Sequence, residues 1–271
     1  MSVADTWNPE QYDRFKAERS QPFWDLAGLL GEVRPGARLV DLGCGTGELT
    51  AALAARIGAD EALGLDVADT MLAEAGVHAS ETVRFERGDL ASFADPGAWD
   101  VVFSNAALQW VPDHVGVLGR WAAALGPGGV LAVQVPANAD HPSHTVAAEV
   151  AEQQPFRSAF AAGPPPDPVA GHVLTPERYC EVLVGLGLRD VHVRLQVYPH
   201  VLDRTADIVE WVKGTSLNRY RAALPAPLYD EFIESYRAAL LERLGGDRSP
   251  CLYPFKRILM RGFAGQPAGD R

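Results

Sequence analysis

The chain has 271 residues, which suffices for one α/β core with an added lobe rather than for several full domains. Its formal net charge of −11 argues against nucleic acid as the substrate, and the sequence predicts neither a secretion signal nor a membrane-spanning segment. The three cysteines lack the spacing of metal ligands, so we expect no metal and a reducing, cytoplasmic location.

The charge is distributed unevenly along the chain. Residues 204–271 hold 11 Lys and Arg against 8 Asp and Glu, a net of +3, which leaves −14 for residues 1–203. A basic region on an acidic protein suits a small anionic substrate, although a solvated basic face is the commoner explanation.

Two helices are predicted at the start of the chain, at 8–20 and 22–33, from apolar residues at helical spacing. These helices precede the first predicted strand and do not connect two strands of the sheet, so their apolar faces must cover another part of the protein. We expect a lid over the ligand cleft, with Trp7, Tyr12 and Arg19 at its edge. Packing on the flank of the sheet is an equal alternative for each of these residues.

A glycine-rich loop follows the first predicted strand, at 38–42. Glycine occupies positions 43, 45 and 47, and a helix is predicted from 49 to 57. Alternate glycines allow a sharp turn and let the backbone approach a ligand that a Cβ atom would exclude. The ligand would then lie at the start of the following helix, where backbone N–H groups have no partner.

The second predicted strand, at 62–66, ends in Asp66, a carboxylate that can accept both hydroxyls of a ribose. A dinucleotide-binding loop would have its third glycine where this chain has Glu48, and that carboxylate would repel a pyrophosphate. A nicotinamide oxidoreductase is therefore disfavoured. Asp41 and Glu48 would instead attract a ligand with an amine and a sulfonium. This loop resembles the first motif of the class I methyltransferases, whose cofactor is S-adenosylmethionine (SAM).

Further cofactor contacts are predicted where later elements end. The helix at 69–75 would place Met71 near the purine, and the strand from 83 would lead into a turn in which Asp89 accepts the adenine amino group and the Leu90 N–H meets a ring nitrogen. The residues predicted to bind the cofactor are Trp7, Tyr12, Arg19, Asp41, Gly43, Cys44, Gly45, Gly47, Asp66, Val67, Met71, Asp89, Leu90, Asn105, Ala106 and Gln109.

The middle of the chain continues the alternation of strands and helices. A strand at 99–105 ends at the carboxyl edge of the sheet, where open α/β sheets bind ligands, and residues 106–114 are expected to face the transferred methyl group. A helix at 117–125 and a turn at 126–129 lead to an apolar strand at 130–136, as expected for a strand buried on both faces.

Beyond residue 136 the pattern loosens. The proline-rich stretch 163–168 predicts an irregular excursion over 137–172. The remaining predicted elements are a helix at 175–187, a strand at 191–197, helices at 207–214, 217–224 and 227–244, and a last strand at 257–263.

This order predicts an α/β fold, a doubly wound, seven-stranded, mostly parallel Rossmann-like sheet with a helical cap over its carboxyl edge. The predicted segments are N-terminal lid helices (1–34), the SAM-binding core (35–136), a cap insertion (137–172), the continuation of the core (173–203), the helical cap (204–250), and the last core strand with the tail (251–271).

Several stretches resemble the trans-aconitate 2-methyltransferase family. They are Trp-Asn-Pro at 7–9, Ala-Glu-Arg-Ser at 17–20, the loop at 41–45, the segments 104–114 and 129–136, and Tyr-Pro-Phe-Lys-Arg at 253–257. The resemblance implies that SAM methylates one carboxylate of trans-aconitate, giving a monomethyl ester and S-adenosylhomocysteine. Malonyl-carrier-protein O-methyltransferases share something like the Leu-Gln-Trp part of the segment 104–114.

The chemistry of a carboxylate acceptor agrees with the residues. The reference pKa of a carboxyl group is about 4, so the acceptor is ionised at neutral pH and needs no general base. We therefore expect no essential catalytic residue. His114 is the one base available near the strand ends, and it either removes a proton or hydrogen-bonds to a substrate carboxylate.

A polycarboxylic acid must be met by cations or strong donors, ideally the planar fork of arginine. On the helix that holds Arg219 and Arg221, only one of the two can face inward. The residues predicted to bind the substrate are Gln109, Trp110, His114, Arg219, Tyr220, Lys256 and Arg257. For each cap arginine a surface salt bridge is at least as good an explanation.

Three other functions remain open. A malonyl-carrier-protein methyltransferase would need a basic outer face and would ignore free trans-aconitate, and a methyltransferase of a hydroxylated metabolite would need His114 as base. A non-catalytic SAM-binding module would release no S-adenosylhomocysteine. We expect a small anionic polycarboxylic acid as partner, no nucleic acid or membrane, and a monomer or weak dimer.

Overall fold

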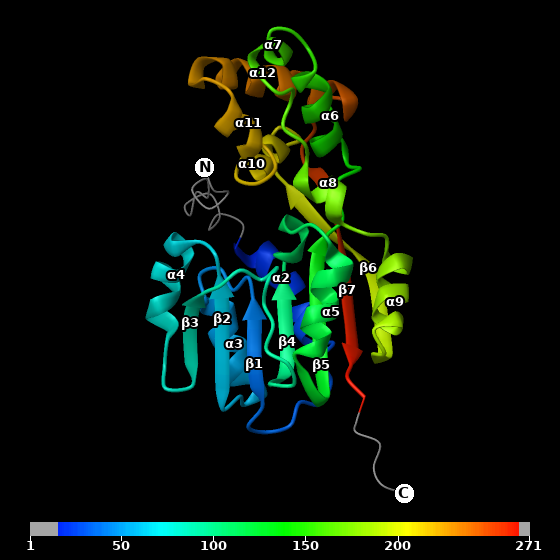
Figure 1. Cartoon of the computed structure of the whole chain (residues 1–271). Helices are drawn as coiled ribbons and strands as arrows, with labels where there is room; N and C mark the ends of the chain where they lie inside the picture. Colours follow the sequence, from blue (N-terminus) through cyan, green and yellow to red (C-terminus); the bar gives the residue numbers. More distant parts are fainter. Residues whose placement is uncertain (1–15, 266–271) are drawn as a thin grey trace, which may run out of the picture. The chain divides into compact units, whose positions relative to one another are not determined.

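The computed structural model describes residues 16–265, apart from the side chains of residues 16–19, 168 and 169, and the remaining residues lie outside this range. Within it the chain forms two compact units, one built on a β-sheet and one built from helices (Figure 1). We call them the sheet unit, residues 17–136, 172–196 and 257–265, and the helical unit, residues 137–171 and 197–256.

The sheet has seven strands in the order β3-β2-β1-β4-β5-β7-β6 (Figure 1). All neighbouring pairs from β3 to β5 are parallel, and β7 is antiparallel to β5. The predicted doubly wound, mostly parallel sheet is confirmed. The strands are β1 (Arg38–Leu42), β2 (Glu61–Asp66), β3 (Val83–Arg87), β4 (Trp99–Asn105), β5 (Leu125–Pro136), β6 (Arg189–Leu202) and β7 (Cys251–Phe263).

The direction of winding changes between β1 and β4, and ligands of such sheets bind at the carboxyl ends of the strands beside this point. Figure 1 shows α5 in front of the sheet and α2 behind it. The helices of the sheet unit are α2 (Lys16–Ala27), α3 (Glu48–Ile57), α4 (Asp69–Ala75), α5 (His114–Ala123) and α9 (Pro176–Gly185), with 3-10 turns η2 (Gly76–His78) and η3 (Leu108–Trp110).

Helix α2 packs against one face of the sheet. Its Phe23 and Leu26 are buried in one apolar cluster with Leu53 of α3 and Phe103 of β4, and the rings of Phe23 and Phe103 lie 4.8 Å apart. The choice between a lid and flank packing for Trp7, Tyr12 and the side chain of Arg19 lies outside the described residues and stays a prediction. The prediction of a break between two helices near Pro22 is wrong, because Pro22 lies inside α2. The apolar packing around Pro22 offsets the loss of the backbone hydrogen bond that proline cannot make.

The turn predicted at 126–129 is also wrong, because these residues lie within β5. Here β5 runs beside the start of β4 with a shift in register, and a Cβ atom added to Gly129 would lie 2.9 Å from the carbonyl oxygen of Trp99. The glycines thus permit close approach of two strands rather than a reversal of the chain. Strands β6 and β7 are longer than predicted, and each runs from one unit into the other.

The helical unit has its own core, formed largely by aromatic rings such as Phe156, Phe232 and Tyr236. The prediction of an irregular excursion over 137–172 is wrong in part, since three helices lie within it and only 137–141, 152–155 and 160–167 are irregular. The helices outside the sheet unit, or joining it, are α6 (Pro142–Ala151), α7 (Phe156–Ala159), α8 (Pro168–His172), α10 (Asp207–Lys213), α11 (Asn218–Ala223) and α12 (Ala226–Arg243). A position for this unit over the carboxyl edge stays a prediction. No helix of the described part is both long and apolar enough to cross a membrane.

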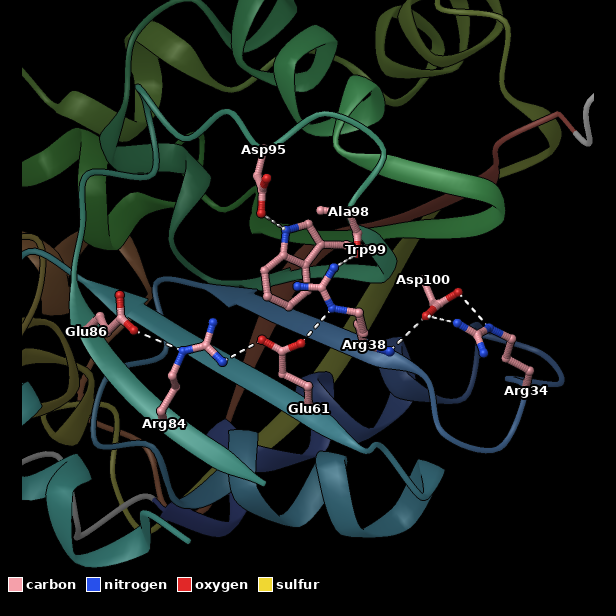
Figure 2. A network of polar contacts seen from close by, with 9 residues as sticks. All are labelled: Arg34, Arg38, Glu61, Arg84, Glu86, Asp95, Ala98, Trp99 and Asp100. Atoms are coloured by element: carbon pink, nitrogen blue, oxygen red, sulfur yellow. Dashed lines mark hydrogen bonds and ion pairs between the residues drawn. The ribbon is translucent and has the colours of Figure 1, made fainter. Parts of the chain in front are cut away.

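A polar network ties together the opposite, amino ends of the strands (Figure 2). Arg38 at the start of β1 donates to Glu61 of β2 and to the carbonyl of Ala98, at 2.6 Å in both cases, and its guanidinium lies 4.7 Å from the ring centre of Trp99. Arg84 of β3 donates to the same Glu61 at 2.5 Å. These contacts fix the strand starts relative to one another, at the edge remote from the predicted ligand.

Replacing Arg38 by methionine should lower the free energy of unfolding by about 1 kcal/mol, because the hydrogen bonds are lost while the apolar stem over Trp99 is kept. SAM affinity should not change. Urea denaturation and isothermal titration calorimetry measure the two quantities. The control is Arg87→Met, which removes a far more exposed pair with Asp69 and should have little effect on stability. Equal losses in both variants would contradict this view of the network.

Candidate functional site

The glycine loop between β1 and α3 has left-handed backbone at three positions, Gly43 (φ 87°), Gly45 (φ 56°) and Gly47 (φ 73°). A Cβ atom at Gly43 would overlap the Cβ atom of Ala107, and one at Gly47 would lie 2.6 Å from the ring of Phe85. At Gly45, by contrast, a Cβ atom would meet nothing within 4 Å. Gly43 and Gly47 therefore serve packing within the protein, whereas Gly45 marks the open side of the loop.

Asp66 at the end of β2 orders this loop. Its carboxylate accepts the N–H of Gly45 at 3.0 Å and the N–H of Ala68 at 2.9 Å. A carboxylate has about four lone-pair positions, so two such bonds leave acceptor capacity for hydroxyl groups. The side chain thus fits the predicted ribose contact, which stays a prediction.

Asp41 is a buried acid beneath the loop, with 3 % of its surface exposed. Burial raises its pKa to about 7, and the negative charge of Asp66 acts in the same direction, while the hydroxyl of Thr50 donates to the carboxylate and opposes the rise. A positive group bound nearby would favour the ionised form. This is the electrostatic preference predicted for a ligand with an amine and a sulfonium.

The carboxyl edge of β4 carries buried polar atoms that lack partners. Within residues 16–265, neither Asn105 Oδ1 nor Gln109 Oε1 has a hydrogen-bond partner. Ala106 between them is left-handed (φ 55°), donates to the carbonyl of Gln134, and accepts from Gln109 Nε2 at 2.6 Å. Unsatisfied buried oxygens are costly, so their concentration here is what a site for a polar ligand requires.

Arg257 reaches the same edge from β7. It is 7 % exposed and donates to Gln134 Oε1 at 3.2 Å, and Gln134 is the register partner of Asn105. Gln134 is not among the predicted site residues, although it is the one polar residue in the apolar run at 130–135. A single polar residue in an otherwise apolar strand was the signal in the sequence that could have identified Gln134 as a site residue.

Two predicted substrate residues of the helical unit, Arg219 and Lys256, have carboxylate partners inside that unit. Arg219 lies 2.6 Å from Asp167 and donates to the Tyr220 hydroxyl at 2.9 Å. Burial would raise the pKa of Asp167, but a hydrogen bond from His144 and the charge of Arg219 hold it well below its ordinary value. Lys256 donates to Asp140 at 2.5 Å. Their contact with a substrate stays a prediction.

The remaining predicted cofactor residues of the sheet unit flank the loop and the strand ends. Val67 is 45 % exposed and Met71 is half-buried, while Asp89 is exposed and accepts the N–H of Ala91 at 2.9 Å. The carbonyl of Leu90 accepts from Trp121 Nε1. Trp110, predicted for the substrate, is 37 % exposed. Trp7, Tyr12 and the side chain of Arg19 lie outside the described residues.

Cys44 lies partly buried in the loop, and burial raises the pKa of its thiol, which makes it unreactive. In the described part of the chain, no three His, Cys, Asp or Glu side chains are grouped as a metal ion would require.

The fold and this site define a class of protein. A glycine loop between β1 and α3, an acid at the end of β2 and a seventh strand inserted antiparallel beside β5 are features of the class I SAM-dependent methyltransferases, and residues 39–129 match the methyltransferase domain family. The open side of the loop at Gly45 and the unsatisfied oxygens of β4 fit that cofactor.

Two solved structures share the fold. One is the YcgJ protein from Bacillus subtilis, with a TM-score of 0.56 at 18% identity, covering 90% of this chain and 100% of that chain. The other is phosphoethanolamine N-methyltransferase 2 from Haemonchus contortus, with a TM-score of 0.55 at 18% identity, covering 98% of this chain and 60% of that chain.

Sequence relatives give the family. The chain is 44% identical to a trans-aconitate 2-methyltransferase from Deinococcus radiodurans, over 94% of this chain and 96% of that protein. It is 37% identical to one from Streptomyces avermitilis, over 93% and 95% respectively. The chain belongs to the trans-aconitate 2-methyltransferase family, so the resemblance seen in the motifs is confirmed, and with it the assignment as a SAM-dependent methyltransferase.

The two glycines Gly43 and Gly45 should respond differently to alanine. Gly43→Ala should lower the free energy of unfolding by about 3 kcal/mol, because the added methyl overlaps Ala107. Gly45→Ala should cost only about 1 kcal/mol for its left-handed backbone. Its added methyl lies on the open side, so its main loss should be in SAM affinity. Denaturation and calorimetry measure both, and equal destabilisation would contradict this division of roles.

Asp41 should make the ligand-free protein less stable as the pH rises from about 4 to 7. Its pKa is raised in the folded state, so the unfolded chain releases the proton first and the stabilisation present at low pH is lost over this interval. The loss is about 4 kcal/mol. Asp41→Asn should remove this contribution, since the amide oxygen can still accept from Thr50. Urea denaturation at several pH values tests it, and parallel profiles for parent and variant would contradict it.

Proposed function

We propose that this chain transfers the methyl group of SAM to a carboxylate of trans-aconitate, giving the monomethyl ester and S-adenosylhomocysteine. The observation that carries the proposal is a buried arginine, Arg257, at the same edge of the sheet as the unsatisfied amide atoms of Asn105 and Gln109. A cation among amides matches an anionic, oxygen-rich acceptor. The names of the relatives point to the same acid.

SAM supplies a methyl group on a positively charged sulfur, which is already a good leaving group. The residues of this chain have to bind and orient it. In the proposal Asp66 accepts the ribose hydroxyls, and the open side of the loop at Gly45 faces the methionine part of the cofactor. The negative charge of Asp41 balances the positive groups of the cofactor.

The acceptor carboxylate needs no activation, because it is ionised at neutral pH. The remaining work is positioning and exclusion of water, and positioning alone can contribute about 7–11 kcal/mol to lowering the barrier. This explains why the site can be rich in hydrogen-bonding amides. The free state of all three cysteines agrees with the cytoplasm as location, and we expect a monomer or weak dimer.

The direct test is incubation with SAM carrying a labelled methyl group and a panel of free polycarboxylic acids, followed by detection of a base-labile methyl ester. The proposal requires labelled ester and S-adenosylhomocysteine in equal amounts with trans-aconitate. In a parallel incubation with a malonyl carrier protein, labelling of that protein but of no free acid would support the other candidate. Binding of SAM without release of S-adenosylhomocysteine would indicate a non-catalytic module.

Arg257→Ala should raise the Michaelis constant for trans-aconitate about 30-fold, because a buried charge-assisted contact to the substrate is lost. SAM affinity should change far less. Arg257→Lys should restore only part of the loss, since an ammonium cannot form two parallel bonds. The matched control is Arg261→Ala on the same strand, whose guanidinium pairs with Asp190 at 2.8 Å. A Michaelis constant unchanged by Arg257→Ala would remove the arginine from the substrate site.

A further inference from the structure

His114 is the only candidate base that the sequence places near the strand ends, and its surroundings decide which ring nitrogen carries the proton. It is the first residue of α5 and is 3 % exposed. Its Nδ1 atom lies 2.6 Å from the hydroxyl of Tyr179 in α9, a residue that is fully buried. No local pattern links His114 to Tyr179, because the two residues are 65 positions apart.

The direction of that hydrogen bond follows from a third group. The backbone N–H of Leu174 donates to the Tyr179 hydroxyl at 3.2 Å, so the phenol oxygen already acts as an acceptor there. Its own proton needs an acceptor, and among the described residues the only acceptor that this hydroxyl contacts is His114 Nδ1. If Nδ1 donated instead, a buried phenol proton would be left without a partner, which costs free energy.

The charge state of the ring follows from its position. Burial lowers the pKa of His114, and the nearby ring of His172, whose centre is 6.5 Å away, lowers it further. The carbonyls of Leu108 and Val111 and the carboxylate of Asp113 act in the opposite direction without cancelling the shift. The amino end of a helix also disfavours a positive ring. Burial raises the pKa of Tyr179, so the phenol keeps its proton.

We propose that Tyr179 is a positioning residue that holds His114 as an uncharged hydrogen-bond donor, with its ring proton on Nε2, for an acceptor that arrives already ionised. Nδ1 is occupied by the phenol proton. Nε2 is buried and has no hydrogen-bond partner among residues 16–265, so its proton is available to a ligand oxygen. A histidine in this state has no lone pair free to remove a proton, which argues against a hydroxylated acceptor.

The identity of the ligand oxygen as a carboxylate rests on the proposed function, whereas the position of the ring proton does not. Nitrogen-15 NMR of histidine-labelled protein tests the second point without any substitution. The expected spectrum shows an unprotonated Nδ1 and a protonated Nε2 for His114, assigned by its loss in His114→Gln. Tyr179→Phe should release the ring to a mixture of both forms. A proton on Nδ1 in the parent protein would overturn the proposal.

Two substitutions of His114 test the donor itself. The glutamine amide nitrogen lies near the position of Nε2, and the asparagine amide nitrogen lies near that of Nδ1. His114→Asn should therefore raise the Michaelis constant for trans-aconitate about tenfold more than His114→Gln, at similar melting temperatures. If both variants instead lose turnover number to the same large extent, His114 is a base and the proposal fails.

Unchanged kinetics in both variants would also overturn the assignment of His114 as a donor to the substrate. If no polycarboxylic acid is methylated at all, the proposed function fails, but the NMR result still decides the tautomer. The two failures are therefore distinguishable.

Discussion

The carboxylate of Asp66 is the interaction on which the site depends. By accepting N–H groups from Gly45 and Ala68, it joins the end of β2 to the glycine loop that follows β1. The loop has left-handed backbone at three glycines. Fixing glycine in one conformation costs conformational entropy, and these hydrogen bonds offset that cost. One acid thus orders the backbone and keeps acceptor capacity for a ribose, at the carboxyl edge where the winding of the sheet changes direction.

The two ends of the strands have different physical characters. At the amino ends, the charged groups of Arg38, Glu61 and Arg84 satisfy one another across three neighbouring strands (Figure 2). At the carboxyl ends, Asp41 is buried with a raised pKa, and the amide oxygens of Asn105 and Gln109 have no hydrogen-bond partner in the described part of the chain. Buried groups without partners destabilise the free protein, and they are retained where a bound ligand satisfies them. The hydrogen-bonded amino ends of the strands supply compensating stability.

The sheet could be predicted from the sequence because β1, β2 and β4 contain short apolar runs and β3 alternates apolar and charged residues up to Arg87, while Asp66 and Asn105 end β2 and β4. The prediction failed where a local signal had two meanings. The glycines at 126–129 indicate a turn in isolation, but they allow β5 to approach β4 closely, a fact about the partner strand. Helix α6 was missed because the prolines beyond it dominated the pattern, although Val146 and Val150 are buried at helical spacing. Within the site, Gln134 left a signal in the sequence, whereas Tyr179 left none because only tertiary packing brings it to His114.

The contacts of the arginines bear on which of them meets the substrate. Asp167 is part of the same helical unit as Arg219 and lies 2.6 Å from it, with both side chains nearly buried. A substrate carboxylate would have to displace this one and leave it buried without its cation, which is strongly unfavourable. Arg257 donates to the amide oxygen of Gln134 at the carboxyl edge of β5. Arg219 is better explained as a structural residue that fixes the proline-rich stretch 163–167 to α11.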